Sequence, residues 1–170
     1  VASAAIKVTV SGVLQINISE RIPAFIWRKD DVISVIDEKG EFIRLATSRL
    51  DYPELPLVIG EAANLSIADI SSLMEDNQYF LDQVRAFVRV GERRWDLVLD
   101  NNLRIMLPQA EFLAAFDRLM LMSESGSLFS NQLSSIDMRL VERPTVRVGA
   151  ASVDPVSYTH LRAHETTRHL

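Results

Sequence analysis

The chain has 170 residues, a formal net charge of -5 at pH 7 and no cysteine. This length allows one well-packed core or two small ones, and 48% hydrophobic with 24% charged residues is ordinary for a soluble globular protein. The negative charge gives no global attraction to phosphate, and the lack of cysteine excludes disulfides and thiolate metal sites. No apolar run approaches the roughly 18 residues needed to span a bilayer, and no signal peptide is visible.

The first segment predicts a β-hairpin. Residues 5–10 alternate loosely, Ser11-Gly12 forms a turn, and residues 13–20 alternate apolar with polar side chains. Because the chain begins at Val1 inside a strand-like pattern, we expect a fragment in which the other strands of this sheet lie upstream. Pro23 interrupts the pattern and marks a boundary between two units.

The next segment predicts a mixture of short strands and one helix. The runs AFIW, VISVID and FIRL between residues 24 and 45 predict three strands, and residues 57–59 predict a fourth. A helix is expected to begin near Ser66, whose hydroxyl would cap it, with Asp69 in the capping-box position. The apolar stripe of this helix consists of Leu65, Ile70, Leu73 and Met74.

Residues 86–108, AFVRVGERRWDLVLDNNLRIMLP, predict three strands joined by two tight turns. Trp95, Leu97 and Leu99 recur with a period of two, which places them on one face of a sheet. Gly91 and residues 100–102 tolerate the left-handed backbone of hairpin turns, and Pro108 ends the last strand because it has no amide proton.

The remaining elements complete an α+β fold. An apolar face at helical spacing predicts a helix over residues 111–122, and residues 123–126 end it. A last hairpin is expected, with strands at 135–140 and 145–148 around a turn at 141–144. The predicted fold is therefore a mostly antiparallel sheet with two helices, preceded by a separate strand pair.

The tail from residue 154 onward differs from everything before it. It contains all three histidines, and His160 and His164 have the i, i+4 spacing of zinc ligands on a helix. The tail has no carboxylate-rich surroundings to support such a site, and PVSYTHLRAHETTRHL resembles translated sequencing-adaptor sequence. We therefore expect residues 154–170 not to be native, and we expect neither a metal site nor a cofactor.

The rest of the chain does not favour an enzyme. Without histidine or cysteine, it cannot form a Ser-His or Cys-His triad. The acidic pairs at 30–31, 37–38 and 75–76 fall at turns or helix ends, where solvated acids are expected, and adjacent side chains point apart. Gly60 and Gly91 stand alone and form no phosphate-binding loop.

Two features are candidates for binding. The Arg93-Arg94-Trp95 cluster could stack a base or clamp a phosphate, but a solvated turn followed by a core tryptophan is the favoured interpretation. Exposed arginines are also common in protein interfaces. The final strand at 145–148 either offers an unpaired edge to a partner strand or is blunted by Arg147, and the sequence leaves both open.

Four segments together resemble the periplasmic part of the bacterial FtsQ/DivIB cell-division family. They are ERIPAFIWRKDDVISVIDEKGEFI (20–43), LPLVIGE (55–61), RVGERRWDLVLDNNLRIMLP (89–108) and SIDMRLVERPTVRV (135–148). The pattern RVGERRWDL resembles alphaproteobacterial members most closely. The resemblance implies that residues 1–22 end a truncated POTRA domain and that residues 23–153 form the family's β-domain.

The resemblance also implies a function. Members are non-enzymatic, bitopic inner-membrane scaffolds of the divisome that bind FtsB and FtsL and thereby regulate septal peptidoglycan synthesis. In the family, FtsB binds by adding a strand to the edge formed by the final strand. An arginine at the rim, just before the strand that begins with tryptophan, also contributes to the contact. Leu140 and Val148 occupy positions where enterobacterial members have aromatic residues. The resemblance therefore implies strand pairing through the backbone in this chain, but not anchoring by aromatic side chains. The implied partner-binding residues are Leu140, Glu142, Thr145, Val146, Arg147, Val148 and Arg93. Arg93 is the candidate for the family's arginine, and Glu92 is equally close to that position.

Two other classes of protein remain as alternatives. A POTRA-type module of an outer-membrane assembly or secretion system would need repeated POTRA units or barrel strands. A carbohydrate- or peptidoglycan-active enzyme would need paired acids that converge in a cleft.

Overall fold

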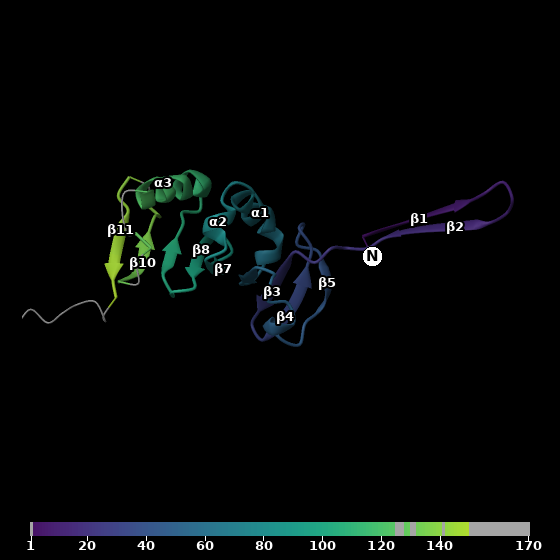
Figure 1. The fold of residues 1–170 in the computed structure, drawn as a ribbon, viewed down its shortest axis with the longest axis horizontal. Coiled ribbons are helices and arrows are strands. Elements are labelled where there is room, and N and C mark those ends of the chain that lie inside the picture. The colour runs from purple at the N-terminus through teal and green to yellow at the C-terminus, as the bar shows by residue number, and fades with distance from the viewer. Residues whose placement is uncertain (1, 125–127, 130–131, 141, 150–170) are drawn as a thin grey trace, which may run out of the picture.

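The computed structural model describes residues 2–124, 128–129, 132–140 and 142–149. It contains a separate two-stranded sheet and a nine-stranded sheet with the order β11-β10-β9-β8-β7-β6-β3-β4-β5. Figure 1 shows the β1–β2 hairpin projecting from the body on a short connecting segment. The strands are β1 (Ser3–Val8), β2 (Leu14–Ser19), β3 (Phe25–Lys29), β4 (Val32–Ile36), β5 (Phe42–Leu45), β6 (Leu57–Ile59), β7 (Val84–Val90), β8 (Arg94–Leu99), β9 (Arg104–Met106), β10 (Leu133–Asp137) and β11 (Thr145–Val148). The helices are α1 (Ile67–Asp76), α2 (Gln78–Leu81) and α3 (Phe112–Glu124), with 3-10 turns η1 (Arg49–Asp51) and η2 (Ala63–Ser66).

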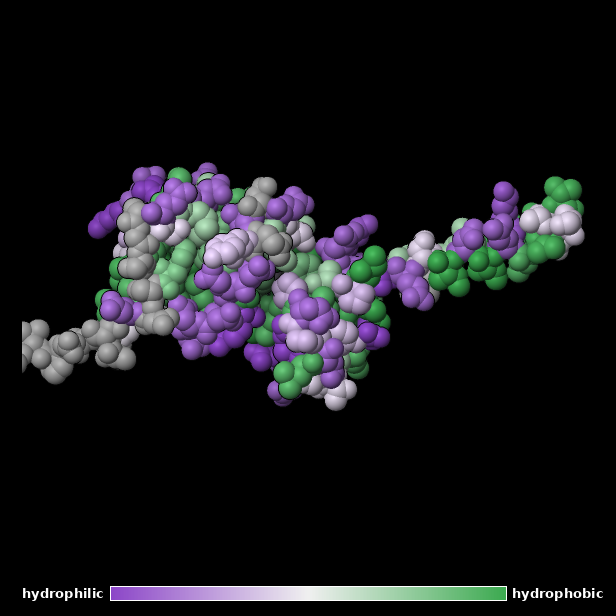
Figure 2. Space-filling model, viewed as in Figure 1, coloured by the Kyte–Doolittle hydropathy of each residue, from purple (hydrophilic) through white to green (hydrophobic). Residues whose placement is uncertain are grey.

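The predicted N-terminal hairpin is confirmed. Ile6 lies opposite Ile16 and Val8 opposite Leu14, so these apolar side chains share one face. All four are more than half exposed, and Figure 2 shows apolar side chains along the projecting hairpin. The hairpin therefore has an amphipathic pattern, but no described layer covers its apolar face.

The nine-stranded sheet is mixed but mostly antiparallel, as the sequence predicts. Neighbouring strands are parallel only at β3–β6, β6–β7 and β9–β10. Parallel neighbours need long crossover connections. Helices α1 and α2 lie in the connection from β6 to β7, and α3 lies in the connection from β9 to β10.

The core lies between the helices and one face of this sheet. Leu97 and Ile105 are fully buried there, as is Trp95, which confirms the period-two pattern of the predicted meander. Phe80 of α2 contacts Phe116 of α3 edge-on, with ring centroids 5.3 Å apart. Full burial of a large aliphatic side chain contributes about 1.5–3 kcal/mol, so this layer dominates the stability of the sheet.

The helix predictions need two corrections. The helix near Ser66 exists, but η2 precedes it and Ser66 makes no side-chain capping bond. Asp69 accepts a hydrogen bond from Trp95 instead, so the predicted capping box is wrong. The four-residue helix α2 was not predicted, because one turn is too short to show helical periodicity. Among the described residues, no helix combines the length and apolar content needed to cross a membrane.

The strand before the final edge also differs from its predicted bounds. It ends at Asp137 rather than Leu140, and the amide of Met138 makes a last hydrogen bond to the carbonyl of Met106 at 2.9 Å. Leu140 lies beyond the strand, in a turn in which its carbonyl accepts from the amide of Arg143 at 2.9 Å. The observed strand therefore ends three residues before its predicted end.

Candidate functional site

Strand β11 is one of the two outer strands of the nine-stranded sheet, and β10 is its sole described neighbour. The amide of Gly149, just after β11, donates to the carbonyl of Gln132 at 2.7 Å. Inward and outward amides alternate along an antiparallel strand, so those of Thr145 and Arg147 also face β10. The amides of Val146 and Val148 therefore face outward.

The two faces of this edge have different chemistry. Val146 lies opposite Ile136 and shares the helix-covered face, with 52% of its surface exposed. Val148 points to the same face and is 50% exposed. Thr145 and Arg147 point to the opposite, uncovered face. The edge thus offers apolar contacts on one side and polar contacts on the other.

Leu140 and Glu142 lie in the turn that leads into β11. Leu140 is 70% exposed, so it is available at the surface, although it lies outside the strand in which the sequence analysis placed it. A carboxylate oxygen of Glu142 lies 3.7 Å from Nη1 of Arg118 on α3. This exposed ion pair contributes little stability.

Arg93 lies in the exposed turn between β7 and β8, where Gly91 and Glu92 both have a φ of 58°. The register runs from Asp96 on β8 through β9 and β10 to Thr145 on β11. The turn is therefore at the same end of the sheet as the start of β11, and the strand that follows it, β8, is three strand spacings, or about 14 Å, from β11. Arg93 belongs to the rim of the site rather than to its edge.

The sequence analysis missed a buried carboxylate beside this rim. Asp96 is 2% exposed and lies between two arginines, with Nε of Arg94 3.4 Å from Oδ1 and Nε of Arg104 3.2 Å from Oδ2. Burial raises the pKa of Asp96, and the two arginines oppose that rise. The hairpin turn before β9 places Arg104 opposite Val98, which makes it a diagonal neighbour of Asp96 on the same face, so the pair could have been found from the register.

A second pair fixes the chain where it leaves β10. The guanidinium of Arg139 donates two hydrogen bonds to the carboxylate of Asp137, from Nε to Oδ1 at 2.9 Å and from Nη2 to Oδ2 at 2.6 Å. This hydrogen bonding lowers the pKa of the Asp137 carboxyl. The backbone amide of Arg139 also donates to Oδ1 of Asp137 at 3.0 Å. The start of the turn that carries Leu140 is therefore held in place.

Trp95 is a core residue, as the favoured interpretation of its cluster predicts. It is 1% exposed, and its Nε1 donates to Oδ2 of Asp69 at 3.0 Å. The guanidinium of Arg89 lies 4.8 Å from the centre of the indole ring. The ring is thus unavailable for stacking on a base, and Arg94 is paired with Asp96. Arg93 is the exposed member of the cluster.

One member of the acidic pairs is not solvated, which corrects the prediction for the pair at 37–38. Asp37 is 7% exposed and accepts from Arg21 at 2.5 Å and from the amides of Lys39 and Glu41, each at 2.9 Å. Burial alone would raise the pKa of Asp37, but these hydrogen bonds outweigh it and lower the pKa. Its role is structural, because it joins the segment before β3 to the β4–β5 turn.

Within the described ranges, no three histidine, cysteine or acidic side chains gather as metal ligands would. The histidines His160, His164 and His169 lie outside these ranges. The described site therefore consists of a strand edge, its turn and a rim of charged residues.

The fold and this edge can now be compared with known proteins. The family model for the C-terminal part of cell division protein FtsQ/DivIB matches residues 25–139, which is more than half of the chain. The chain therefore belongs to the FtsQ/DivIB family of cell division proteins. The matched region ends before the turn and β11.

Curated relatives match a larger share of the chain than the family model does. Cell division protein FtsQ of Jannaschia sp. (strain CCS1) is 37% identical over 97% of this chain and 53% of its own length. FtsQ of Ketogulonicigenium vulgare (strain Y25) is 39% identical over 81% of this chain and 45% of its own length. FtsQ of Bartonella bacilliformis is 38% identical over 78% of this chain and 43% of its own length. The chain spans about half the length of the curated relatives it matches.

Proposed function

We propose that this chain is a non-enzymatic scaffold of the divisome whose β11 edge binds FtsB by strand addition. FtsL joins the same complex, and through these partners the scaffold recruits and regulates septal peptidoglycan synthesis. The family assignment supports the cell-division role, and it displaces the alternative of an outer-membrane assembly or secretion module. The partners and the docking mode are the proposed part.

The observation that carries this proposal is that no strand of the described residues pairs with the outer side of β11. The outward amides of Val146 and Val148 can pair with a partner strand, and main-chain hydrogen bonds supply affinity in strand addition. The half-exposed valine side chains supply an apolar contact on the helix-covered face. Thr145 and Arg147 on the other face of β11, together with Leu140, Glu142 and Arg93 on the rim, complete the contact surface.

A proline substitution at Val146 tests the proposal. Val146→Pro removes an outward amide donor and leaves the inward bonds of Thr145 and Arg147 to β10 unchanged, so the fold should persist. We expect binding of the FtsB periplasmic segment to be lost in a pull-down, with circular dichroism unchanged. Val146→Thr keeps the amide and the β-branch, and should retain binding. Normal binding by Val146→Pro would exclude strand addition at this edge.

The location and domain organisation are also proposed. We infer that residues 23–153 form a periplasmic β-domain of a bitopic inner-membrane protein and that residues 1–22 belong to a POTRA domain. The uncovered apolar face of the β1–β2 hairpin supports the second assignment, because a strand pair of a larger sheet needs such a face.

A further inference from the structure

A cleft of about 690 Å³ opens far from the docking edge, on the face of the sheet that the helices do not cover. Leu57 and Ile59 of β6 line it, next to Ala86 and Val88 of β7. These residues alternate with core residues such as Val58, so they point away from the helices. The floor of the cleft is therefore an apolar strip along two parallel strands.

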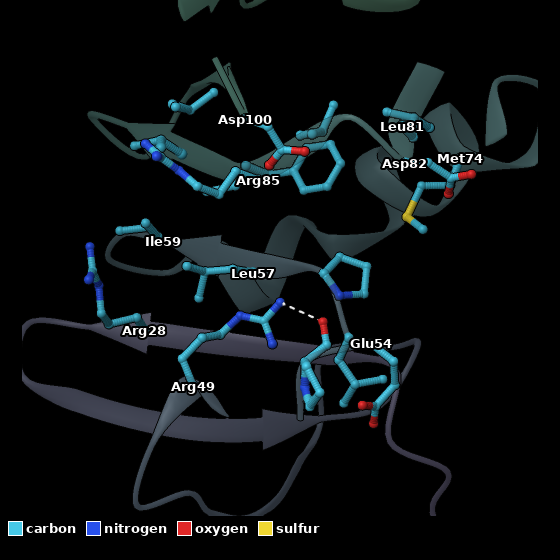
Figure 3. Close-up of a pocket in the computed structure, with 18 residues that line it drawn as sticks. Arg28, Arg49, Glu54, Leu57, Ile59, Met74, Leu81, Asp82, Arg85 and Asp100 are labelled. Carbon is cyan, nitrogen blue, oxygen red and sulfur yellow. Dashed lines mark hydrogen bonds between the residues drawn. The ribbon is translucent and has the colours of Figure 1, made fainter. Parts of the chain in front are cut away.

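The loop between η1 and β6 forms one wall of this cleft. The guanidinium of Arg49 donates to the carbonyls of Tyr52 and Pro53, which holds the loop in a compact shape. Figure 3 shows Arg49 and Glu54 along this wall. Hydrogen bonds within the loop thus hold this wall in place, and the guanidinium of Arg49 is engaged in them.

Two other arginines at the cleft have no such partner. Arg28 lies in register with Ile59, and Arg85 is the extra residue of the β-bulge between Val84 and Ala86. Both side chains are exposed, and within the described part of the chain neither has an ion pair or a hydrogen bond. Figure 3 shows both reaching toward the Ile59 end of the cleft. Asp100 also lines the cleft, but no ion pair joins it to Arg85.

These arginines stand apart from most arginines in the described chain. Six of the others pair with acids: Arg21, Arg89, Arg94, Arg104, Arg118 and Arg139. Arg44 stacks on Tyr52. Besides Arg28 and Arg85, the arginine side chains without a described partner are Arg93, Arg143 and Arg147, which lie around the proposed docking edge. Arg28 and Arg85, beside an apolar floor, therefore form a second group of arginines without a described partner, as expected for a second contact surface.

The opposite end of the cleft has the opposite charge. Glu54 and Asp82 lie there, and Figure 3 shows them on the far side of Leu57 from Arg28. A uniformly anionic partner, such as a membrane surface or a polyphosphate, would be repelled at that end. A ligand whose charge changes sign along its length matches both ends.

We propose that this cleft binds a short extended polypeptide segment of a partner protein. An acidic residue of the segment contacts Arg28 and Arg85, apolar residues cover Leu57 and Ile59, and a basic residue lies toward Glu54. A guanidinium is well suited to hold a carboxylate through paired hydrogen bonds. The nearest strand of this surface, β7, is four strand spacings, or roughly 19 Å, from β11, and β6 and β3 are farther away, so the surface can be occupied together with the docking edge.

A peptide titration of the full chain tests this proposal. The probe is acetyl-Glu-Leu-Val-Leu-Lys-amide, compared with acetyl-Glu-Leu-Val-Leu-Glu-amide, and backbone amide chemical shifts are followed by NMR. The dipolar peptide should shift the amides of Leu57, Ile59 and Val88. Arg28→Gln and Arg85→Gln should each weaken its binding about three- to tenfold, while Arg143→Gln should not.

Several results would overturn the proposal. Tighter binding of the doubly acidic peptide, or of phosphatidylglycerol vesicles, would show that the cleft takes a general anion. Shifts that map to β11, or that persist unchanged in Arg28→Gln and Arg85→Gln, would place the peptide elsewhere. The Val146→Pro variant should bind the dipolar peptide normally, so failure here and failure at the docking edge are distinguishable.

Discussion

The β1–β2 hairpin and the nine-stranded sheet follow the same sequence rule with opposite results. In both, apolar side chains alternate with polar ones and share a face. In the large sheet, Leu97 and Ile105 are completely buried beneath helices. In the hairpin, Ile6 and Ile16 are 67% and 53% exposed. Alternation therefore decides which side chains share a face, while a separate layer decides whether that face contributes stability.

The difference has an energetic consequence. Removal of apolar surface from water contributes about 25 cal/mol per Å², and the hairpin leaves most of its apolar surface in water. A two-stranded hairpin without a covering layer is marginally stable. The hairpin should therefore open locally while the nine-stranded sheet stays folded, and matched substitutions in the two regions should have very different effects.

The largest effect is expected in the core. Leu97→Ala leaves a cavity beneath the helices and should lower the free energy of unfolding by about 2–5 kcal/mol. Ile16→Ala, a comparable truncation in the hairpin, should change it by less than about 0.5 kcal/mol. Urea denaturation followed by tryptophan fluorescence measures both. Similar losses in the two variants would mean that the hairpin face is covered.

A smaller effect is expected at the polar support of the core tryptophan. Asp69→Ala leaves Nε1 of Trp95 without its acceptor and removes the ion pair of Arg89, so it should cost about 1–3 kcal/mol. Glu75→Ala, an exposed position on the same helix, is the control and should cost less than about 0.5 kcal/mol. Equal losses at the two positions would contradict a supporting role for Asp69.

The next effect depends on pH and concerns the junction of the two regions. The pKa of Asp37 is lower in the folded state than in the unfolded chain, so its ionised form stabilises the fold at neutral pH. This stabilisation should be lost as the pH falls below about 4 and through the folded-state pKa. Asp37→Asn should therefore lower stability by about 1 kcal/mol at pH 7 and flatten the acid dependence.

The urea midpoint measured from pH 7 to pH 3 checks this dependence on Asp37. Asp31→Asn, at an exposed position, serves as the control and should keep the wild-type profile. An unchanged acid dependence in Asp37→Asn would show that the Arg21–Asp37 contact does not stabilise the junction.

The smallest effect is expected from the tail. Removal of residues 154–170, which lie outside the described ranges, should leave the melting temperature unchanged. Differential scanning calorimetry of the full and shortened chains compares them directly. A clear drop would show that the tail contributes to the folded structure.

Much of the fold could be predicted from the sequence, because local patterns determine it. The period-two runs and turn residues around Gly91 and residues 100–102 predict the β7–β8–β9 meander correctly. The final edge strand at Thr145–Val148 also has its predicted bounds. The features that were missed depend on tertiary contacts. Asp69 binds Trp95 rather than capping a helix, and Asp96 is buried where alternation predicts solvent.

In the candidate site, too, features set by local sequence patterns could be predicted, whereas features that depend on tertiary contacts could not. Sequence patterns indicate where the last strand lies, but only the register shows that Arg93 is at the same end of the sheet as Thr145. The cleft at Arg28 and Arg85 was not predicted, because these arginines come from strands β3 and β7, which are far apart in sequence and flank β6 through parallel pairing. Single-sequence patterns contain no signal for such pairing.

Amide hydrogen exchange at β11 tests the central claim most directly. In the free chain, the outward amides of Val146 and Val148 should exchange much faster than the inward amides of Thr145 and Arg147. Addition of the FtsB periplasmic segment should protect Val146 and Val148 strongly and leave the opposite edge, β5, unchanged. Binding that leaves these two amides unprotected would contradict strand addition at this edge.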